Sequence, residues 1–457
     1  MESNDPIDLA VIGGGLAGLA AAALAARGGA KVRLFERART LGGRAATQEK
    51  EGFSLNLGPH ALYRGAAGAE VLATLDIRPR GAPAPTTGGH AICGGVKHVL
   101  PAGLRSLLST RLLGAGGKLE TARLLARLAS IDPLPLAGVP VSEGLARLTR
   151  HGAVRQLLEA LFRLSTYGNA PRLQSAGAAL EQLQRALSRG VLYLDGGWQQ
   201  LVDALRESAI AAGVTIETGV RACRIDISAA GAVSAVRLAD GRIVRCNTAI
   251  VTGSPDDALA ALGPATPASG TSAGEPSGPS PHAVIETWAR AVVPVRAACL
   301  DVALRRLPSV HSNFALGIDA PLYLSVHSAV ARLAPAGAAL LHVARYLDPS
   351  EPENPVRDRQ ELERLLDLVQ PTWREQVVHQ RFLPSLTVAH AHVTAAQGGT
   401  AGRPGPAVPG VRGLFVAGDW VGPEGLLADA ALASARRAVE LWRGEGAEVG
   451  LLSRAAT

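Results

Sequence analysis

Residues 7–26 read IDLAVIGGGLAGLAAAALAA, and this stretch decides how the rest of the chain is interpreted. Asp8 is its only formal charge, so a membrane span, a signal peptide and a cofactor site all have to be considered. A signal peptide begins with basic residues, whereas this chain begins MESNDPID, which is acidic. A membrane span fits poorly, because three consecutive glycines separate two segments with different periodicities. We therefore expect a buried strand over 7–12 and an Ala-rich helix over 16–27.

Three glycines between these segments, Gly13, Gly15 and Gly18, have the spacing G-x-G-x-x-G. Gly13 permits a tight turn, Gly15 lets a pyrophosphate approach the backbone, and Gly18 lets the helix pack closely on the strand. A second expected strand, KVRLFE, ends on Glu36, 18 residues beyond Gly18. A carboxylate at that place would take the ribose hydroxyls. Strand, glycine turn, helix and acid together predict a dinucleotide site.

The residues directly after Glu36 distinguish between classes of dinucleotide. They read RARTLGGRAAT, with Gly42-Gly43-Arg44, and NLGPHAL follows at 56–62. Here the chain resembles the FAD-dependent oxidoreductases related to phytoene desaturase, protoporphyrinogen oxidase and the flavin amine oxidases, in which a Glu is followed by a GGR turn. The resemblance implies that Arg44 approaches the FAD pyrophosphate. The chemistry agrees, because a guanidinium beside two glycines can meet a diphosphate bidentately.

Three more landmarks of this family follow in order. LYLDGGWQQLVDAL at 192–205 resembles its Gly-Gly turn before a helix, and GVTIETGVRACRI at 213–225 resembles a strand pair whose Val220 would contact the adenine. GLFVAGDWVGPEGLLADAALASARRAVE at 413–440 resembles a unit in which Asp419 accepts hydrogen bonds from the flavin's sugar-alcohol chain. The helix that follows would point its N-terminus at the flavin and favour the negative charge of the reduced ring.

One departure lies in this last landmark. Ser434-Ala435-Arg436 stands where the family often has Ser-Gly-Arg or Ser-Gly-Lys. Alanine is a good helix former, so we expect a packing adjustment there and retained cofactor binding.

The resemblance implies an α/β fold, with a Rossmann-like FAD-binding domain of the glutathione-reductase type and an inserted α+β substrate domain. We expect mostly helices over 99–189, strands near 296–307, 321–328 and 338–347, and a helix over 354–368. The predicted division is 1–80, 190–260 and 386–457 for the FAD-binding domain, 81–189 and 282–385 for the substrate-binding domain, and a Pro/Ser/Gly-rich flexible loop at 263–281.

The site residues that the resemblance implies are almost all expected at the cofactor. They are Gly13, Gly15, Leu16, Ala17, Gly18, Glu36, Arg37, Gly43, Arg44, Gly58, Pro59, His60, Val220, Gly418, Asp419, Gly425, Leu426 and Leu427.

Four further side chains leave alternatives open. His60 follows a motif that in this family lies beside the flavin ring, so it is the one candidate for a catalytic contact, and a hydrogen-bonded structural histidine fits as well. Trp420 either stacks near the cofactor or fills the core. His390 and His392 have a spacing that would place both on one face of a strand, as two metal ligands would lie. No third ligand is apparent, so no metal is expected.

Composition narrows the class of protein further. The chain has 457 residues, 47% hydrophobic and 19% charged, which is enough for sizeable buried cores. Its net charge is +7, but the basic residues are scattered, so nucleic acid is not an expected partner. The cysteines match no metal or redox spacing, and we expect buried reduced thiols in a cytoplasmic protein. They are Cys93, Cys223, Cys246 and Cys299.

The segment 100–130 combines many leucines with five basic residues. A basic amphipathic helix can lie on an anionic membrane and give a lipophilic substrate a path, which would make the protein a peripheral membrane protein. The other interpretation, which the pattern favours, is a helix that covers the substrate pocket with its arginines solvated.

The chemistry follows from the flavin, which supplies the redox step while the protein orients a bond against it. Flavin amine oxidases commonly use a lysine of the substrate domain and an aromatic cage, but this chain has no lysine after Lys118 and only 4% aromatic residues. We therefore predict hydride transfer to FAD from a lipophilic small molecule, isoprenoid or carotenoid-like or polyketide-like, during desaturation or oxidation. No second G-x-G-x-x-G follows a strand, so oxygen, a quinone or another acceptor would take the electrons.

Other functions on the same fold stay open. A protoporphyrinogen-oxidase or amine-oxidase type of flavin oxidase and a redox-neutral flavin isomerase would carry the same motifs. A binding protein without flavin chemistry would not need all of Gly13, Gly15, Gly18, Glu36, Arg44 and Asp419.

Overall fold

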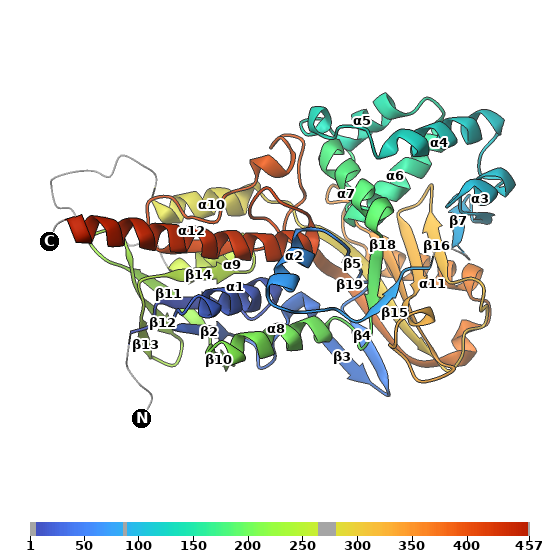
Figure 1. The fold of residues 1–457 in the computed structure, drawn as a ribbon. Coiled ribbons are helices and arrows are strands. Elements are labelled where there is room, and N and C mark those ends of the chain that lie inside the picture. Colours follow the sequence, from blue (N-terminus) through green and yellow to red (C-terminus); the bar gives the residue numbers. More distant parts are fainter. Residues whose placement is uncertain (1–5, 86–88, 264–279, 456–457) are drawn as a thin grey trace.

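A computed structural model describes residues 6–85, 89–263 and 280–455, and Figure 1 shows an elongated molecule with a sheet toward each end. The first sheet has five parallel strands in the order β10-β2-β1-β14-β20. These strands are β1 (Leu9–Ile12), β2 (Val32–Glu36), β10 (Thr215–Thr218), β14 (Ala249–Thr252) and β20 (Leu414–Ala417). Parallel strands buried on both faces are short apolar runs such as LAVI, which is why 9–12 forms a central strand.

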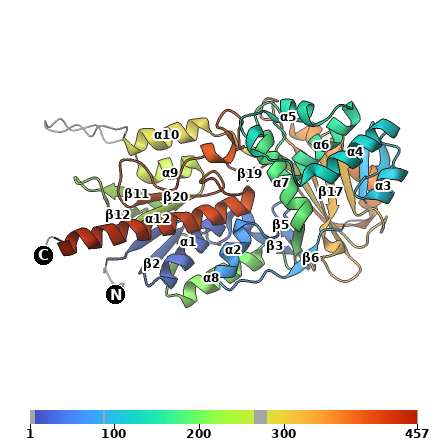
Figure 2. The ribbon, with the colours of Figure 1, turned by 45° about the horizontal axis from the view of Figure 1, so that its top comes forward.

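A core lies on each face of this sheet. Successive side chains of a strand point to opposite sides, so neighbouring residues of one strand belong to different cores. Leu9 and Val11 belong to one core and Ala10 to the other. The first core also receives α1 (Leu16–Arg27), α2 (Ala67–Thr74), α8 (Gln199–Ala211) and α12 (Leu427–Ala455). The second receives α9 (Pro255–Leu262), α10 (Pro281–Ala291) and a small sheet of β11 (Ala222–Ile227), β12 (Val233–Leu238) and β13 (Ile243–Arg245). Figure 2 shows α1, α2, α8 and α12 gathered together, away from α9 and α10.

The second sheet has seven strands in the order β19-β15-β18-β17-β16-β7-β8. All its pairs are antiparallel except β16 with β7. Its strands are β7 (Gly89–Cys93), β8 (Val96–Val99), β15 (Val295–Leu304), β16 (Phe314–Gly317), β17 (Leu322–Val326), β18 (Ala339–Tyr346) and β19 (Val377–Ala389).

Helices pack around this second sheet. The helix α11 (Pro355–Val369) shares a core with Ala298, Leu300 and Val302, so these alternate residues of β15 face it. Ala297 and Cys299 point to the opposite face, toward the first sheet. A further core joins β7 and β16 to a group of helices, namely α3 (Leu104–Ser109), α4 (Ala115–Leu128), α5 (Val141–Leu148), α6 (Gly152–Thr166) and α7 (Ala176–Arg189).

Short strands connect the two parts of the molecule. The strands β3 (Thr47–Lys50) and β4 (Phe53–Asn56) form a hairpin, and β9 (Val191–Leu194) lies between β5 (Leu62–Tyr63) and β6 (Gly81–Pro83). The chain therefore passes between the two large sheets several times, as an inserted domain requires.

The α/β fold class with a Rossmann-like sheet is confirmed, and so are the expected strand, helix and strand over 7–36. The domain boundaries given above stay predictions. Of the expected flexible loop, 264–279 lies outside the described residues, while Pro281 begins α10, which packs against α9.

The four cysteines are free, but the expectation that all are buried is wrong. Cys246 and Cys299 are buried and Cys93 is half-buried, whereas Cys223 is exposed. Cys223 lies on β11 in the small outer sheet, at the register shift between Ala222 and Arg224.

Candidate functional site

A cavity of about 440 Å³ lies where the carboxyl ends of β1, β2, β14 and β20 approach the second sheet. Ligands of open parallel sheets bind in this kind of crevice. Residues on one wall follow the parallel strands directly, and residues on the other belong to β15 and β19. The cavity therefore has a wall from each of the two large sheets.

The glycine turn after β1 leaves the start of α1 open. Gly15 is the N-cap, no side chain caps the helix, and a Cβ built on Gly15 would find only Gly42 O, 3.9 Å away. Gly42 N–H donates to Gly14 O at 2.8 Å, which holds the GGR turn beside this helix end. Free backbone N–H groups at a helix start, next to open space and an arginine, fit a diphosphate. These residues therefore fit the pyrophosphate of FAD.

Glu36 lies at the adjoining end of the cavity. Its carboxylate accepts hydrogen bonds from Gly14 N–H at 2.6 Å and from Ala38 N–H at 2.8 Å. Val220 N–H donates to the backbone oxygen of Glu36 at 2.9 Å, so the two predicted residues for adenine and ribose are neighbours. Both line the cavity.

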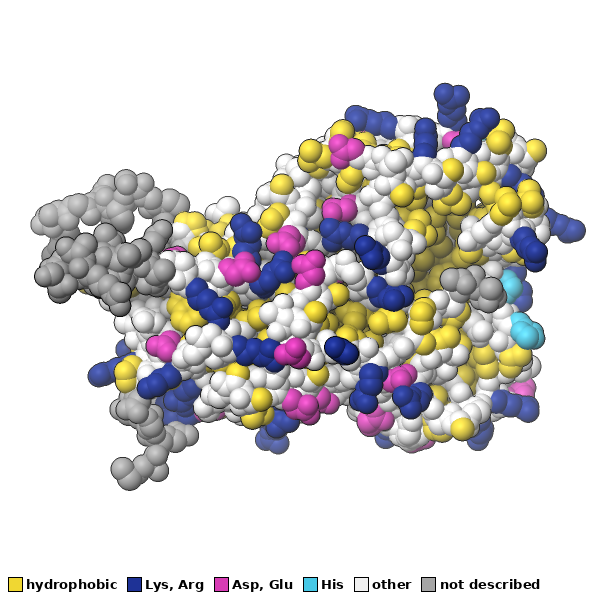
Figure 3. Space-filling view, in the orientation of Figure 1, with side chains coloured by type: hydrophobic (Ala, Val, Ile, Leu, Met, Phe, Trp, Pro, Cys, Tyr) yellow, Lys and Arg dark blue, Asp and Glu magenta, His cyan; other side chains and the backbone are white. Residues whose placement is uncertain are grey.

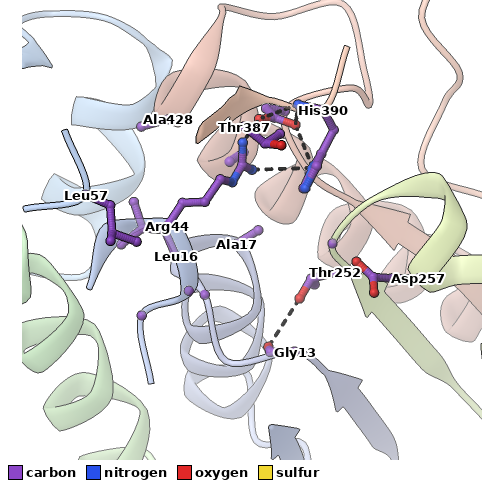
Figure 4. A pocket seen from close by; sticks show the side chains of 18 of the residues that line it. Gly13, Leu16, Ala17, Arg44, Leu57, Thr252, Asp257, Thr387, His390 and Ala428 are labelled. Carbon is purple, nitrogen blue, oxygen red and sulfur yellow. Dashed lines mark hydrogen bonds and ion pairs between the residues drawn. The ribbon is translucent and has the colours of Figure 1, made fainter. Parts of the chain in front are cut away.

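Arg44 and Asp419 are in direct contact at the cavity wall. Figure 4 shows Arg44 reaching toward His390 at the same place. Arg44 Nη1 lies 2.6 Å from Asp419 Oδ2 and also donates to Val388 O at 2.8 Å. His390 Nδ1 lies 3.1 Å from Asp419 Oδ1. Burial by itself raises the pKa of Asp419, but Arg44 and His390 outweigh it and hold that pKa well below its usual value. Asp419 is therefore an ionised acceptor that is 4% exposed at the cavity wall.

The N-terminal turn of α12 closes another side of the cavity. Leu427, Ala428 and Asp429 all line it, and Leu427 has a positive φ of 56°. Asp429 Oδ1 accepts a hydrogen bond from Gly68 N–H at 3.2 Å. Burial raises the pKa of Asp429 to about 6, against the opposing effects of that hydrogen bond and of Arg185. A carboxyl group that titrates near neutral pH thus borders the cavity.

The wall toward the second sheet carries hydroxyl, thiol and apolar groups. Tyr167, Ala297, Cys299 and Leu386 line it, and Trp198 joins them from the start of α8. Burial raises the pKa values of Tyr167 and Cys299 well above their usual ranges, so both are neutral. Among the described residues that line the cavity there is no lysine.

His60 lies between the cofactor turn and this wall. Its Nδ1 is 3.1 Å from Gly58 O, its Nε2 is 3.1 Å from Arg44 O, and its ring meets the edge of Trp198 with centroids 4.9 Å apart. Burial lowers the pKa of His60 to about 4, so the imidazole is neutral at physiological pH and donates from one nitrogen. His60 therefore both lines the cavity and makes structural contacts.

Most residues expected at the cofactor line the cavity: Gly13, Gly15, Leu16, Ala17, Glu36, Arg37, Gly43, Arg44, Pro59, His60, Val220, Gly418, Asp419 and Leu427. Gly18 does not, because it packs against the turn, where an added Cβ would lie 1.8 Å from Gly13 O. Gly58 packs toward Cys299 and Leu386, and Gly425 packs against Asp429. Leu426 lines a second, small cavity.

The structure also decides where Trp420, His390 and His392 lie. Trp420 is 1% exposed, donates to Gly253 O at 2.7 Å and packs in the second core, so it fills the core. The expectation that His390 and His392 share one face of a strand is wrong, because β19 ends at Ala389. His390 lines the main cavity and His392 the small one. Within 6–85, 89–263 and 280–455, no cluster of three His, Cys, Asp or Glu could hold a metal.

The expectation that 100–130 covers the substrate pocket is also wrong. No described residue of this segment lines the cavity, because α4 packs against α3 and α6 instead. In the described part of the chain no helix is both long and apolar enough to span a bilayer.

Several cavity residues were not predicted. Thr252 donates to Ile12 O at 3.0 Å, and Asp257 pairs with Arg37 at 3.1 Å. Figure 4 shows both at the end of the cavity near Gly13. The only sequence signal for Asp429 was an acid in the first turn of an expected helix, and none marked Tyr63, Tyr167 or Cys299.

Comparison with known proteins agrees with this geometry. A family model described as flavin containing amine oxidoreductase matches residues 16–441. A carotenoid 3,4-desaturase from Haloarcula japonica is 48% identical over 52 residues, which are 11% of this chain and 10% of that protein. The solved structure of an oxidoreductase from Methanosarcina mazei has a TM-score of 0.73 at 19% identity, covering 95% of this chain and 100% of the other. A putrescine oxidase variant with redesigned cofactor binding has a TM-score of 0.70 at 14% identity, covering 96% and 99%.

The cavity, its glycine turn and the extent of the family match define a flavoprotein oxidoreductase. The chain belongs to the flavin containing amine oxidoreductase family. It is an FAD-dependent oxidoreductase, and FAD is its cofactor.

Proposed function

We propose that this oxidoreductase desaturates or oxidises a lipophilic small molecule, which gives up a hydride to the flavin. FAD supplies the redox chemistry, so the chain's own residues have to bind the substrate, orient its C–H bond and exclude water. The observation that carries the proposal is the absence of charged side chains on the wall toward the second sheet, at the described residues Tyr167, Ala297, Cys299 and Leu386.

An uncharged wall favours an apolar substrate. Burying an unpaired ammonium or carboxylate against such a wall is costly, whereas an apolar molecule gains from leaving water. Ionised side chains of the cavity, such as Glu36, Arg44 and Asp419, lie instead where the motifs place the cofactor. The short stretch shared with a carotenoid 3,4-desaturase supports the same class of substrate.

An amine is the second candidate substrate. Tyr63, Tyr167 and Trp198 all line the cavity, so aromatic residues that are rare in the whole chain gather there. Asp429 borders the same cavity with a pKa of about 6, and its ionised form could pair with an ammonium group. Against this candidate, no lysine is among the described lining residues.

The test is anaerobic reduction of the bound flavin. The purified holoprotein is mixed without oxygen with an isoprenoid polyene dispersed in detergent, and separately with a diamine and with an aromatic amine. Loss of the visible flavin absorbance with the polyene, and not with the amines, is expected. Reduction by an amine alone would overturn the proposal in favour of the second candidate.

A change in the wall provides a matched pair of variants. Leu386→Asp places a charge on the apolar wall, while Leu386→Met keeps it apolar with similar volume. Leu386→Asp should slow flavin reduction by the polyene at least tenfold, and Leu386→Met should change it little. FAD affinity, measured in parallel, should stay near that of the unchanged protein in both variants. Equal rates for the two variants would contradict an apolar substrate at this wall.

A further inference from the structure

Exposed large hydrophobic side chains are concentrated in one part of the chain, outside the cavity. In this part of the chain, the exposed large hydrophobic residues on β8, α3 and α4 are Val96, Val99, Leu104, Leu108, Leu119 and Leu125. Leu104 and Leu108, four residues apart on α3, are 72% and 65% exposed. The strand β8 packs against α3, and α3 against α4, so these side chains occupy neighbouring elements. Single exposed leucines need no explanation, but a contiguous group of them marks an interaction surface.

The helix α4 carries apolar residues on two faces. Leu124 and Leu128 are buried against α6, together with Gly117 and Thr121, and this stripe accounts for its packing in the fold. On the opposite face Ala115, Leu119 and Ala126 are exposed, while Ala122 between them is half-buried and packs against the same core as Leu124. A solvated helix face is ordinarily polar, whereas Ala115, Leu119 and Ala126 are apolar and exposed.

Basic side chains surround these apolar residues. The segment from Val96 to Leu134 contains six basic residues, Lys97, Arg105, Arg111, Lys118, Arg123 and Arg127, and only two acidic ones, Glu120 and Asp132. Glu120 is already engaged by His151 and by the Arg150 N–H group. In the part of the chain that the structure describes, no carboxylate pairs with any of the six.

Figure 3 shows Lys and Arg side chains interspersed with hydrophobic ones at the end of the molecule formed by α3 and α4, at its upper right. Figure 1 places the far end of α12 at the opposite end of the molecule. The surface formed by α3 and α4 therefore lies at the end of the molecule away from the Rossmann-like sheet.

We propose that β8, α3 and α4 form a docking surface for the interface of an anionic lipid bilayer, with Leu104, Leu108 and Leu119 entering the headgroup region. Exposed leucines beside unpaired cations are the two features that a peripheral membrane surface requires. A second copy of this chain fits less well, because a two-fold interface would bring the same unpaired cations against each other. The surface lies outside the cavity, so its test does not depend on which substrate the cavity takes.

The experiment is flotation of the full-length holoprotein with lipid vesicles. One set contains equal parts of phosphatidylcholine and phosphatidylglycerol, and the other contains phosphatidylcholine alone. The protein should float with the anionic vesicles and remain at the bottom with the neutral ones. Raising the salt concentration should weaken the binding, because exposed charges are screened.

Two variants test the two features separately. Leu104→Ser with Leu108→Ser and Leu119→Ser should lower vesicle affinity at least about tenfold, and Arg105→Glu with Arg111→Glu should do the same. Their matched control is Leu187→Ser with Arg206→Glu, which changes an exposed leucine and an exposed arginine elsewhere and should leave flotation unchanged.

An unchanged visible flavin spectrum in each variant establishes that it is folded. Failure of the unchanged protein to float with anionic vesicles would overturn the proposal, and so would equal losses in the control. Light scattering that shows a dimer, lost in the leucine variant, together with no flotation, would assign the surface to a second copy. The substrate assays with the polyene and the amines are independent of these results.

Discussion

Gly15 and Gly18 belong to one motif, but the structure gives them separable roles that a pair of alanine substitutions can distinguish. A Cβ at Gly18 would lie 1.8 Å from Gly13 O and 3.0 Å from Thr252 Oγ1. To reach a normal contact, α1 has to move away from the turn by more than about 1 Å. A Cβ at Gly15 meets nothing closer than Gly42 O at 3.9 Å, and Gly15 has an ordinary φ of −80°.

These distances set the expected energies. Overpacking of this kind costs about 1–3 kcal/mol, which exceeds the gain of roughly 1 kcal/mol from replacing glycine by alanine within a helix. Gly18→Ala should therefore lower the free energy of unfolding by up to about 2 kcal/mol. Gly15→Ala should lower it by less than about 1 kcal/mol, the size of an N-cap effect. Its methyl group points into the cavity where the pyrophosphate fits, so FAD affinity should fall at least tenfold, or about 1.4 kcal/mol.

Two assays on the apoproteins check both values. Urea unfolding followed by circular dichroism gives the stability, and titration with FAD followed by quenching of flavin fluorescence gives the affinity. Gly15→Ala should lose less stability than Gly18→Ala in the first assay and bind FAD at least tenfold more weakly in the second. If Gly15→Ala is as unstable as Gly18→Ala, or binds FAD as well as the unchanged protein, the separation of roles is refuted.

Three further substitutions have defined outcomes. Asp419→Ala removes the carboxylate that lies 2.6 Å from Arg44, and FAD should be retained at least tenfold less well in fluorescence titration; full flavin occupancy with unchanged affinity would contradict the assigned role. Burial raises the pKa of Asp429 to about 6, so the folded chain binds this proton more tightly than the unfolded chain. The free energy of unfolding should therefore fall by up to ~3 kcal/mol as the pH rises from about 4 to about 6. Asp429→Asn should remove this fall, and identical pH slopes of unfolding free energy for both proteins would refute the shift. Asp301→Asn leaves the Arg381 guanidinium, 2.6 Å from the missing charge, without its buried partner and should cost about 3–5 kcal/mol in urea unfolding, whereas a loss under 1 kcal/mol would rule out a strong buried pair.

Local signals explain how much of the first sheet could be predicted. The strand over 9–12, the glycine turn and α1 are specified within twenty residues, because apolar runs, glycine spacing and an alanine-rich segment all act locally. The strands β15, β17 and β18 were predicted for the same reason. Their order in the sheet depends on distant pairings, which no single segment encodes.

The site was predictable where one motif carries each contact, and not where two segments meet. Arg44 and Asp419 were both expected at the cofactor, but their direct pairing joins positions 375 residues apart. Alternation suggested a shared face for His390 and His392, and it failed because the extended strand ends one residue before His390. Asp429 was overlooked because its importance comes from burial beside Gly68, which only the folded chain reveals.

The low aromatic content also led to too simple an expectation. Few aromatic residues in the chain implied few at the site, yet Tyr63, Tyr167 and Trp198 all line the cavity. Composition averages over the whole chain and does not tell where the residues gather. The amine candidate therefore remains worth testing beside the lipophilic one.

The FAD site and the lipophilic substrate are tested most directly by the visible absorbance spectrum of the purified protein, followed by anaerobic reduction with the isoprenoid polyene and timed re-exposure to air. We expect a flavin spectrum from bound FAD that is bleached by the polyene and restored when oxygen or an added quinone takes the electrons. A colourless protein that cannot be reconstituted with FAD would contradict the cofactor site built from Gly15, Arg44 and Asp419. A bound flavin that only amines reduce would contradict the proposed lipophilic substrate.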